Sequence, residues 1–179
     1  MAVEQPKYAV EVRDGRFELR RYAPLIVAEV QVDGDQGQAV QKGFRRLAGY
    51  IFGANDGGRK IAMTAPVSQA PTDSTSFLSP APGRRWVVQF TMPSAYATKD
   101  LPRPSDPGVR FREEPARRIA ALSFSGVARG RDYAEKAEAL KAWLAARGFS
   151  SRATPVLAQY DPPWTPWFMR RNEVLIEVG

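Results

Sequence analysis

The chain has 179 residues, 44% of them hydrophobic, and a formal net charge of +7 with no histidine and no cysteine. This length and apolar content suffice for one domain with a full core. The missing residue types exclude disulfides, thiolate nucleophiles, histidine bases and the common zinc sites. The Arg-Arg pairs, at 20–21, 45–46, 84–85, 117–118 and 170–171, are spread along the chain. We therefore expect a solvated arginine surface, in which some arginines line an anion site, and no nucleic-acid partner.

The sequence contains no apolar run of the roughly 18 residues that a membrane-spanning helix needs. Residues 1–7 also lack the apolar core of a signal peptide. The sequence therefore predicts a cytoplasmic protein without a membrane span.

Hydrophobic periodicity predicts three N-terminal strands, at 7–13, 17–22 and 25–32, with a turn at Asp14-Gly15. A helix follows, capped by Asp35 with Gln38 as its capping-box partner and ended by Gly53. Its apolar face comprises Val40, Phe44, Leu47, Ala48 and Ile51. An extended segment over 60–67, a loop over 70–85 and a strand over 86–92 complete this half.

Residues 93–108 contain four prolines and little periodicity, and we interpret them as a linker between halves or a long surface loop. Strands are predicted at 109–112, 117–124, 155–160 and 174–178. A second helix is predicted from about 131 to 147, with Asp132 and Glu135 as its capping box. Its apolar face comprises Tyr133, Ala137, Leu140, Trp143 and Leu144.

The two halves follow the same order of elements. Residues 17–34 and 109–126 have equal length, and an offset of 92 places Arg20 on Arg112, Ala28 on Ala120 and Gly34 on Gly126. We interpret this as an internal repeat, about 7–92 and 109–179, within a single domain of residues 1–179. The predicted fold class is α+β, with two helices against a mostly antiparallel sheet and a groove that suits a flat apolar ligand.

A rigid aromatic segment precedes the last strand. Residues 162–173 read PPWTPWFMRRNE, and the prolines exclude a helix interior or a central strand. Such a segment can plug a core or form the wall of a pocket. No nucleophile elbow, phosphate-binding loop or dinucleotide fingerprint occurs, and a carboxylate pair from distant positions is the one catalytic arrangement left open. We therefore expect a binding protein rather than an enzyme.

The chain resembles the SOUL haem-binding protein family over nearly its whole length. The segments that carry the resemblance are 8–13 (YAVEVR), 18–22 (ELRRY), 44–47 (FRRL), 50–55 (YIFGAN), 60–67 (KIAMTAPV), 160–163 (YDPP) and 170–173 (RRNE). The resemblance implies a distorted β-barrel of two β-α-β-β repeats with two flanking helices. It also implies non-covalent binding of haem or a related tetrapyrrole or apolar small molecule.

The resemblance implies a pocket along the first helix, near the loop before the last strand. By position, the binding residues are Val40, Gln41, Phe44, Arg45, Leu47, Ala48, Ile51, Trp164, Trp167, Phe168 and Arg171. Phe44 and Gln41 stand where the family has a methionine and a basic residue, so Lys42, Arg45, Arg46 or Arg171 would meet the carboxylates of the ligand.

No metal site formed by protein ligands is predicted, because there is no histidine; Met63 and Met169 are the soft candidates and Tyr50 a remoter one. Two alternatives stay open. The helical spacing of Phe44, Leu47 and Ile51 also suits core packing, and Arg170 and Arg171 could form structural ion pairs. The same surface could also serve a protein partner, as an interaction or effector-binding module without haem.

Overall fold

The computed structural model describes residues 3–72, 84–128, 130–162 and 164–179. Within these residues the strands are β1 (Tyr8–Asp14), β2 (Phe17–Tyr22), β3 (Leu25–Asp33), β4 (Val67–Pro71), β5 (Arg85–Thr91), β6 (Arg110–Glu114), β7 (Arg117–Phe124), β8 (Val156–Gln159) and β9 (Asn172–Val178). The α-helices are α1 (Gln36–Ile51) and α2 (Gly130–Ala146), and short 3-10 turns span η1 (Thr98–Asp100) and η2 (Trp167–Met169).

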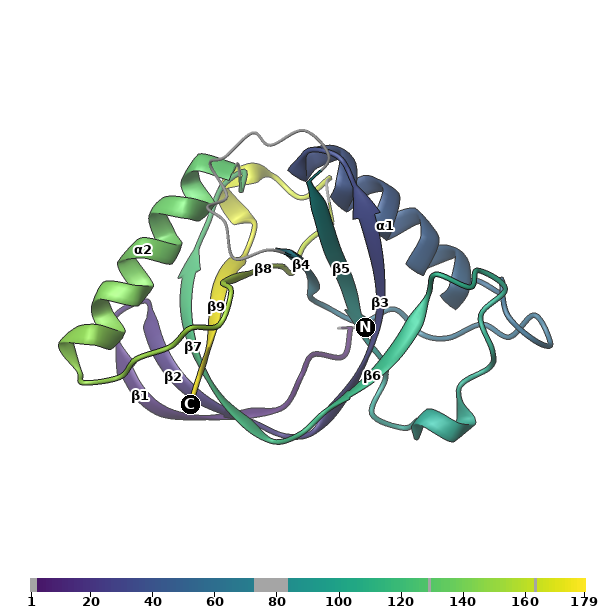
Figure 1. The fold of residues 1–179 in the computed structure, drawn as a ribbon, viewed down its shortest axis with the longest axis horizontal. Coiled ribbons are helices and arrows are strands. Elements are labelled where there is room, and N and C mark those ends of the chain that lie inside the picture. Colours follow the sequence, from purple (N-terminus) through teal and green to yellow (C-terminus); the bar gives the residue numbers. More distant parts are fainter. Residues whose placement is uncertain (1–2, 73–83, 129, 163) are drawn as a thin grey trace.

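All nine strands form one antiparallel sheet in the order β1-β2-β7-β9-β8-β4-β5-β3-β6. The sheet curls into a half-barrel, and α1 and α2 lie on its outer side (Figure 1). The fold is therefore α+β, as predicted. Apart from β1, the order is symmetric about the central β8–β4 pair, because β9, β7 and β2 on one side mirror β5, β3 and β6 on the other. A duplication would produce this symmetry; the duplication itself stays a prediction.

The first half buries its core between α1 and the outer side of β3 and β5. Alternate residues of β3, among them Ala28, Val30 and Val32, face the helix and are buried. The helix α1 lies close to β5 at Gly43, where an added Cβ would lie 2.5 Å from Val88 Cγ2. The helix begins as predicted, with Asp35 Oδ1 accepting a hydrogen bond from Gln38 N at 2.8 Å.

The second half repeats this arrangement with α2. The residues predicted for its inner face are buried against β7, β8 and β9, and these are Tyr133, Ala137, Leu140, Trp143 and Leu144. The predicted capping box is wrong, since α2 begins at Gly130 and Asp132 lies inside its first turn. An acidic side chain in the first turn is still favourable, because it lies near the positive end of the helix dipole. Asp132 therefore indicates the start of the helix although it does not cap it.

Residues 93–108 connect β5 to β6 and so link the two repeats, but they pack against the first core. Leu101 and Val109 are buried in the first core, and Tyr50 Oη donates a hydrogen bond to the Pro102 carbonyl at 2.8 Å. The prolines hide this packing from a periodicity argument because they prevent regular structure. Residues 60–66 form no strand, and β4 begins only at Val67. Most of the loop predicted over 70–85 lies outside the described residues.

Candidate functional site

The inner side of the half-barrel carries a cleft of about 570 Å³. Strand residues alternate between faces, so the neighbours of the core residues point into this cleft. Its apolar lining comprises Leu25 and Val27 of β3, Val87 of β5, Ile119 of β7, Val156 of β8 and Leu175 of β9. Both halves therefore contribute to one concave surface.

A row of alternating charges crosses this cleft. Arg112 of β6 pairs with Glu29 of β3 at 3.3 Å and with Glu114 at 2.8 Å. Arg117 of β7 pairs with Glu114 at 2.9 Å and with Glu177 of β9 at 3.4 Å. We call these five residues the cleft row. Gln89 Nε2 donates to Glu29 Oε2 at 3.0 Å, so the β3 end of the row is also fixed to β5.

A second charged group lies on the inner side of the sheet, between β2 and β9, and is buried. Arg20 of β2 reaches across β7, which presents the small Ala121 on that side, and donates from both terminal nitrogens to Glu173 of β9. Arg20 also donates to Glu18 at 2.7 Å and to the Tyr22 hydroxyl at 2.9 Å. The Arg20 and Glu173 side chains are 2% and 0% exposed, so this pair is sealed from water.

Further groups complete the shell around Glu173. Tyr160 Oη and Ser123 Oγ both donate to its carboxylate, the latter at 3.1 Å. Burial alone would raise the pKa of Glu173, but the hydrogen bonds and the charge of Arg20 outweigh it and hold that pKa below its ordinary value. Burial raises the pKa of Tyr22 to about 12, so this phenol stays neutral.

The aromatic loop, residues 161–171, connects β8 to β9 and is ordered by its own hydrogen bonds. Its two ends are joined by Tyr160 N to the Arg171 carbonyl at 3.1 Å and by Arg171 N to Asp161 Oδ2 at 2.6 Å. Within the loop, Arg170 Nε donates to the Thr165 carbonyl at 2.9 Å. The loop is therefore a preformed feature of the surface.

The large side chains of this loop point outward. Trp164, Trp167, Phe168 and Met169 are 83%, 63%, 60% and 64% exposed. The Trp167 and Phe168 rings contact each other edge to face, with centroids 5.7 Å apart. Of the two roles left open by the sequence, the core plug is excluded for these residues, and the wall of a pocket stays a prediction.

The residues predicted on α1 divide between its two faces. Leu47, Ala48 and Ile51 are buried under the helix. They pack in or beside the core because they lie on the helix stripe that faces β3 and β5, so a surface ligand does not reach them in this conformation. Val40 is half-buried, Gln41 and Arg45 are exposed, and Phe44 is 40% exposed. The Phe44 and Phe90 rings meet edge to face, with centroids 5.5 Å apart. The helix therefore offers a ligand its outer face only.

Arg171, predicted to meet the ligand, is engaged within the protein. Its guanidinium lies 4.0 Å from the Tyr160 ring centre and 3.3 Å from Glu173 Oε2. It also donates to the Tyr8 hydroxyl at 3.4 Å and to Gln5 at 3.2 Å. Arg46, the other engaged candidate, forms a two-point pair with Asp106 at 2.7 and 2.9 Å. Lys42 and Arg45 are exposed and form no ion pair within the described residues.

The cleft row was not predicted from the sequence. Glu29, Glu114 and Glu177 are far apart in the chain, and only the strand pairing brings them together. One signal was available, since the offset of 92 that relates the halves places Arg20 on Arg112. Both arginines lie on the inner face of the sheet and both join two carboxylates.

The donor atoms that could meet an iron are few. Tyr50 is buried and hydrogen-bonded, and burial raises its pKa to about 12, so it does not supply a phenolate. Met63 packs beside the first core and Met92 lies in it, whereas Met169 is exposed on the aromatic loop. Among the described residues no cluster of three or more metal-binding side chains occurs, and neither helix is long and apolar enough to span a membrane.

Comparisons with known proteins agree with this architecture. Residues 3–177 match the family described as SOUL heme-binding protein. The chain is similar to Heme-binding protein 1 of Bos taurus, with 28% identity over 86% of this chain and 76% of that protein. It is similar to Heme-binding protein 2 of Mus musculus, with 27% identity over 98% of this chain and 90% of that protein.

Among solved structures, the EcmrR C-terminal domain superposes with a TM-score of 0.65 and 14% identity, over 91% of this chain and 96% of that domain. At this level of identity the likeness concerns the fold. The match of the family over almost the whole chain is the decisive finding, and the protein belongs to the SOUL heme-binding protein family.

Proposed function

We propose that this protein binds haem or a related flat tetrapyrrole non-covalently, at a surface formed by the aromatic loop and the outer face of α1. Membership in the family suggests the ligand class. The observation that carries the location is the outward position of four large apolar side chains of the loop, Trp164, Trp167, Phe168 and Met169. Exposed patches of this kind mark binding sites, because water contact with aromatic surface is unfavourable.

The loop suits a macrocycle because its shape is set before binding. Hydrogen bonds close its two ends, and Pro162 and Pro166 restrict its backbone. A preformed surface loses little conformational entropy when it captures a ligand. Trp and Phe rings also offer flat faces that stack on a conjugated ring.

The charged groups of the ligand would meet the outer face of α1. Gln41, Phe44 and Arg45 share this face, since they are spaced three and four residues apart or adjacent on the helix. Arg45 and the neighbouring Lys42 are free to meet propionate carboxylates, which guanidinium and ammonium groups bind well. Arg171 instead positions the loop, because it bridges Tyr160, Tyr8 and Glu173.

The residues present fit the macrocycle better than they fit its iron. Histidine ligation is impossible in a chain without histidine. The thioether of Met169 is the exposed soft donor of the described residues, and thioether ligation is weak. Haem bound here would supply redox and oxygen chemistry, and Met169 is the side chain that would be available to its iron. Affinity would come from the apolar contacts.

A haemin titration followed by Soret absorbance and by melting temperature tests this proposal. We expect saturation at one haemin per chain and a raised melting temperature, because a ligand that binds only the folded state stabilises it. The Trp167→Ala/Phe168→Ala variant should weaken binding at least tenfold without lowering the melting temperature of the free protein, since both rings are exposed. Phe44→Asp should weaken binding through an uncompensated charge beside the macrocycle.

The matched control is Phe52→Ala, which removes another exposed ring, at the C-terminal end of α1. It should bind haemin as the parent protein does. Equal weakening by Phe52→Ala and by the loop variant, or a signal that never saturates, would indicate adsorption to a cationic apolar surface and would contradict the proposal.

A protein partner is the second candidate for the same surface. It is favoured by the succession of two tryptophans, a phenylalanine and a methionine on one loop, which is typical of interface centres. If haemin fails to bind saturably, this candidate takes precedence.

A further inference from the structure

We infer that the cleft on the inner side of the sheet is a separate binding site for an organic cation with an apolar body. This inference does not depend on the haem proposal, because none of the loop or α1 residues named above lines the cleft. It rests on the shape of the cleft, on its charge and on its walls.

The charge of the cleft is opposite to that of the whole protein. The cleft row contains three carboxylates, Glu29, Glu114 and Glu177, and two guanidiniums, Arg112 and Arg117. Its formal charge is therefore −1, in a chain whose formal net charge is +7. Arg110 shares this face at the sheet edge, but it does not line the cleft and forms no ion pair in the described part of the chain.

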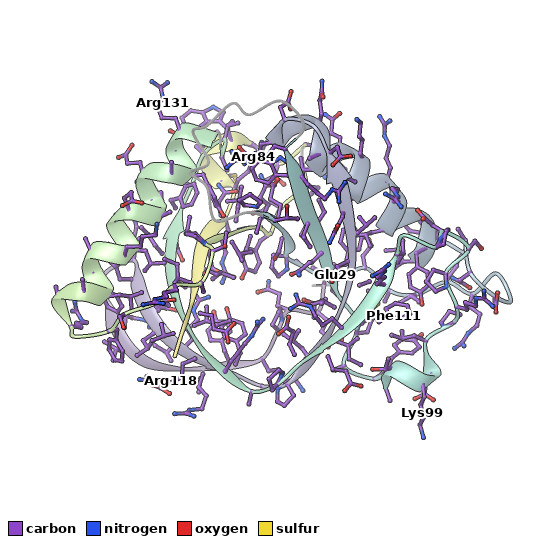
Figure 2. The ribbon with its side chains drawn as sticks, viewed as in Figure 1. Glu29, Arg84, Lys99, Phe111, Arg118 and Arg131 are labelled. Atoms are coloured by element: carbon purple, nitrogen blue, oxygen red, sulfur yellow. The ribbon has the colours of Figure 1, made fainter. Side chains whose placement is uncertain are left out.

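The negative charge is concentrated at the two ends of the row. Each arginine is shared between two carboxylates, and Glu114 is held by both arginines. Glu29 and Glu177 each have a single arginine partner, at 3.3 and 3.4 Å. Glu177 is also 52% exposed. Of the charges in the row, these two carboxylates retain the most capacity for a new cationic partner; Glu29 lies on the inner side of the sheet (Figure 2).

The walls would bury the apolar body of the ligand. Val27 and Val87 come from one half of the sheet, and Ile119, Val156 and Leu175 come from the other. A ligand between them contacts apolar side chains on two sides, and burial of that surface contributes roughly 25 cal/mol per Å². Clefts that combine apolar walls with a few fixed polar groups are the usual sites of small ligands.

A neighbouring hollow of about 490 Å³ extends this site. It shares Pro6, Leu25, Thr91 and Glu114 with the cleft, so the two lie side by side. Its lining adds the carboxylates of Glu4 and Glu113 against one ammonium, that of Lys7. The extension is therefore also acidic, which favours a cation and disfavours a carboxylate ligand such as a tetrapyrrole dianion.

The test compares two fluorescent, flat probes of opposite charge. Berberine, an aromatic cation, should bind saturably at one per chain, and fluorescein, an aromatic anion, should bind at least tenfold more weakly. Glu177→Gln and Glu29→Gln should each weaken berberine binding at least fivefold and, combined, more strongly. Both variants leave Glu114 in place to pair with the arginines, so we expect them to fold, as circular dichroism would check.

Two further variants complete the design. Glu138→Gln removes an exposed carboxylate of α2, one that pairs with Lys141, and changes the net charge equally without altering the cleft; it should bind berberine as the parent does. Gln89→Lys places an ammonium beside Glu29 and should weaken berberine even if the glutamate variants fail to fold. Stronger binding of fluorescein, no saturable binding of berberine, or equal behaviour of the cleft variants and Glu138→Gln would overturn the inference.

The two proposals can fail separately. Protein saturated with haemin should still bind berberine, and the loop variant Trp167→Ala/Phe168→Ala should bind berberine normally. One-for-one displacement of berberine by haemin would overturn the inference of a separate site while leaving saturable haemin binding intact.

Discussion

Arg20 and Arg112 occupy equivalent positions in the two halves, on β2 and β6, and each joins two carboxylates on the inner face of the sheet. The side chain of Arg20 is 2% exposed and that of Arg112 is 49% exposed. The difference comes from what covers them. Tyr8 lies against Arg20, with its ring centre 4.2 Å from the guanidinium carbon, and Tyr22 and Tyr160 close the rest of the shell.

The comparison shows how one fold assigns two roles to the same residue type. On the α2 side of the sheet, the extra edge strand β1 supplies Tyr8, which covers Arg20 and helps to bury it. On the α1 side, β6 is itself the edge strand, so the equivalent Arg112 faces the cleft. We therefore expect variants of the first group to affect stability and variants of the second to affect ligands.

The largest effect on the free energy of unfolding is expected for Glu173→Gln. The change leaves Arg20 buried with a neutral partner in place of its carboxylate, and breaking a buried pair in this way costs about 3–5 kcal/mol. Urea unfolding followed by circular dichroism would measure the loss. A loss below about 1 kcal/mol would show that Arg20 is hydrated in solution and would remove the contrast between the halves.

Acidification is expected to have an intermediate effect on the free energy of unfolding. The pKa of Glu173 is held below its ordinary value of 4.5 in the folded protein. The unfolded chain therefore takes up this proton first. The stabilisation is complete above about pH 4.5 and is lost as pH falls through the folded pKa, at no more than about 1.4 kcal/mol per pH unit.

Urea unfolding between pH 6 and 3 would test this, with Glu173→Gln as the reference. Other carboxylates with lowered pKa values, those of Glu4, Asp14 and Asp106, titrate in both proteins and cancel in the difference. The difference between parent and variant should shrink on acidification. A difference that stays constant would mean that the Glu173 pKa is not lowered by folding.

The smallest effect on stability is expected for Arg112→Gln. The residue is half exposed and its pairs are part of the wet cleft, and such pairs contribute about 0–1 kcal/mol. In the berberine titration the same variant should increase affinity, because it leaves Glu29 without its arginine. Destabilisation as large as that of Glu173→Gln would show that the two groups are equivalent after all.

Much of the fold could be predicted from the sequence because its signals are local. The strand alternation, the Asp35 cap and the apolar face of α2 each depend on residues a few positions apart. The packing of residues 93–108 could not be predicted, because prolines remove periodicity and the contact of Tyr50 with Pro102 spans 52 residues.

The candidate site likewise has parts that could be predicted from local sequence and parts that could not. The aromatic loop was visible in the sequence as a cluster of Trp and Pro, and its exposure was one of two roles left open. Helical spacing identified Leu47 and Phe44 on one apolar stripe but could not separate the buried centre of that stripe from its half-exposed margin. The cleft row was missed, since Glu29 and Glu177 meet the same cleft only after nine strands have paired.

The most direct test of the haem proposal is an NMR titration of the indole N–H signals with gallium protoporphyrin IX, a diamagnetic substitute for haemin. The chain has four tryptophans. Trp86 and Trp143 are buried, and their indoles donate to the Gly34 carbonyl at 3.0 Å and to Asp14 at 2.9 Å. Trp164 and Trp167 are exposed on the aromatic loop. We predict saturable shifts of the Trp164 and Trp167 signals while those of Trp86 and Trp143 stay in place. Shifts confined to Trp86 and Trp143, or no saturable shift of any indole, would contradict the proposed site.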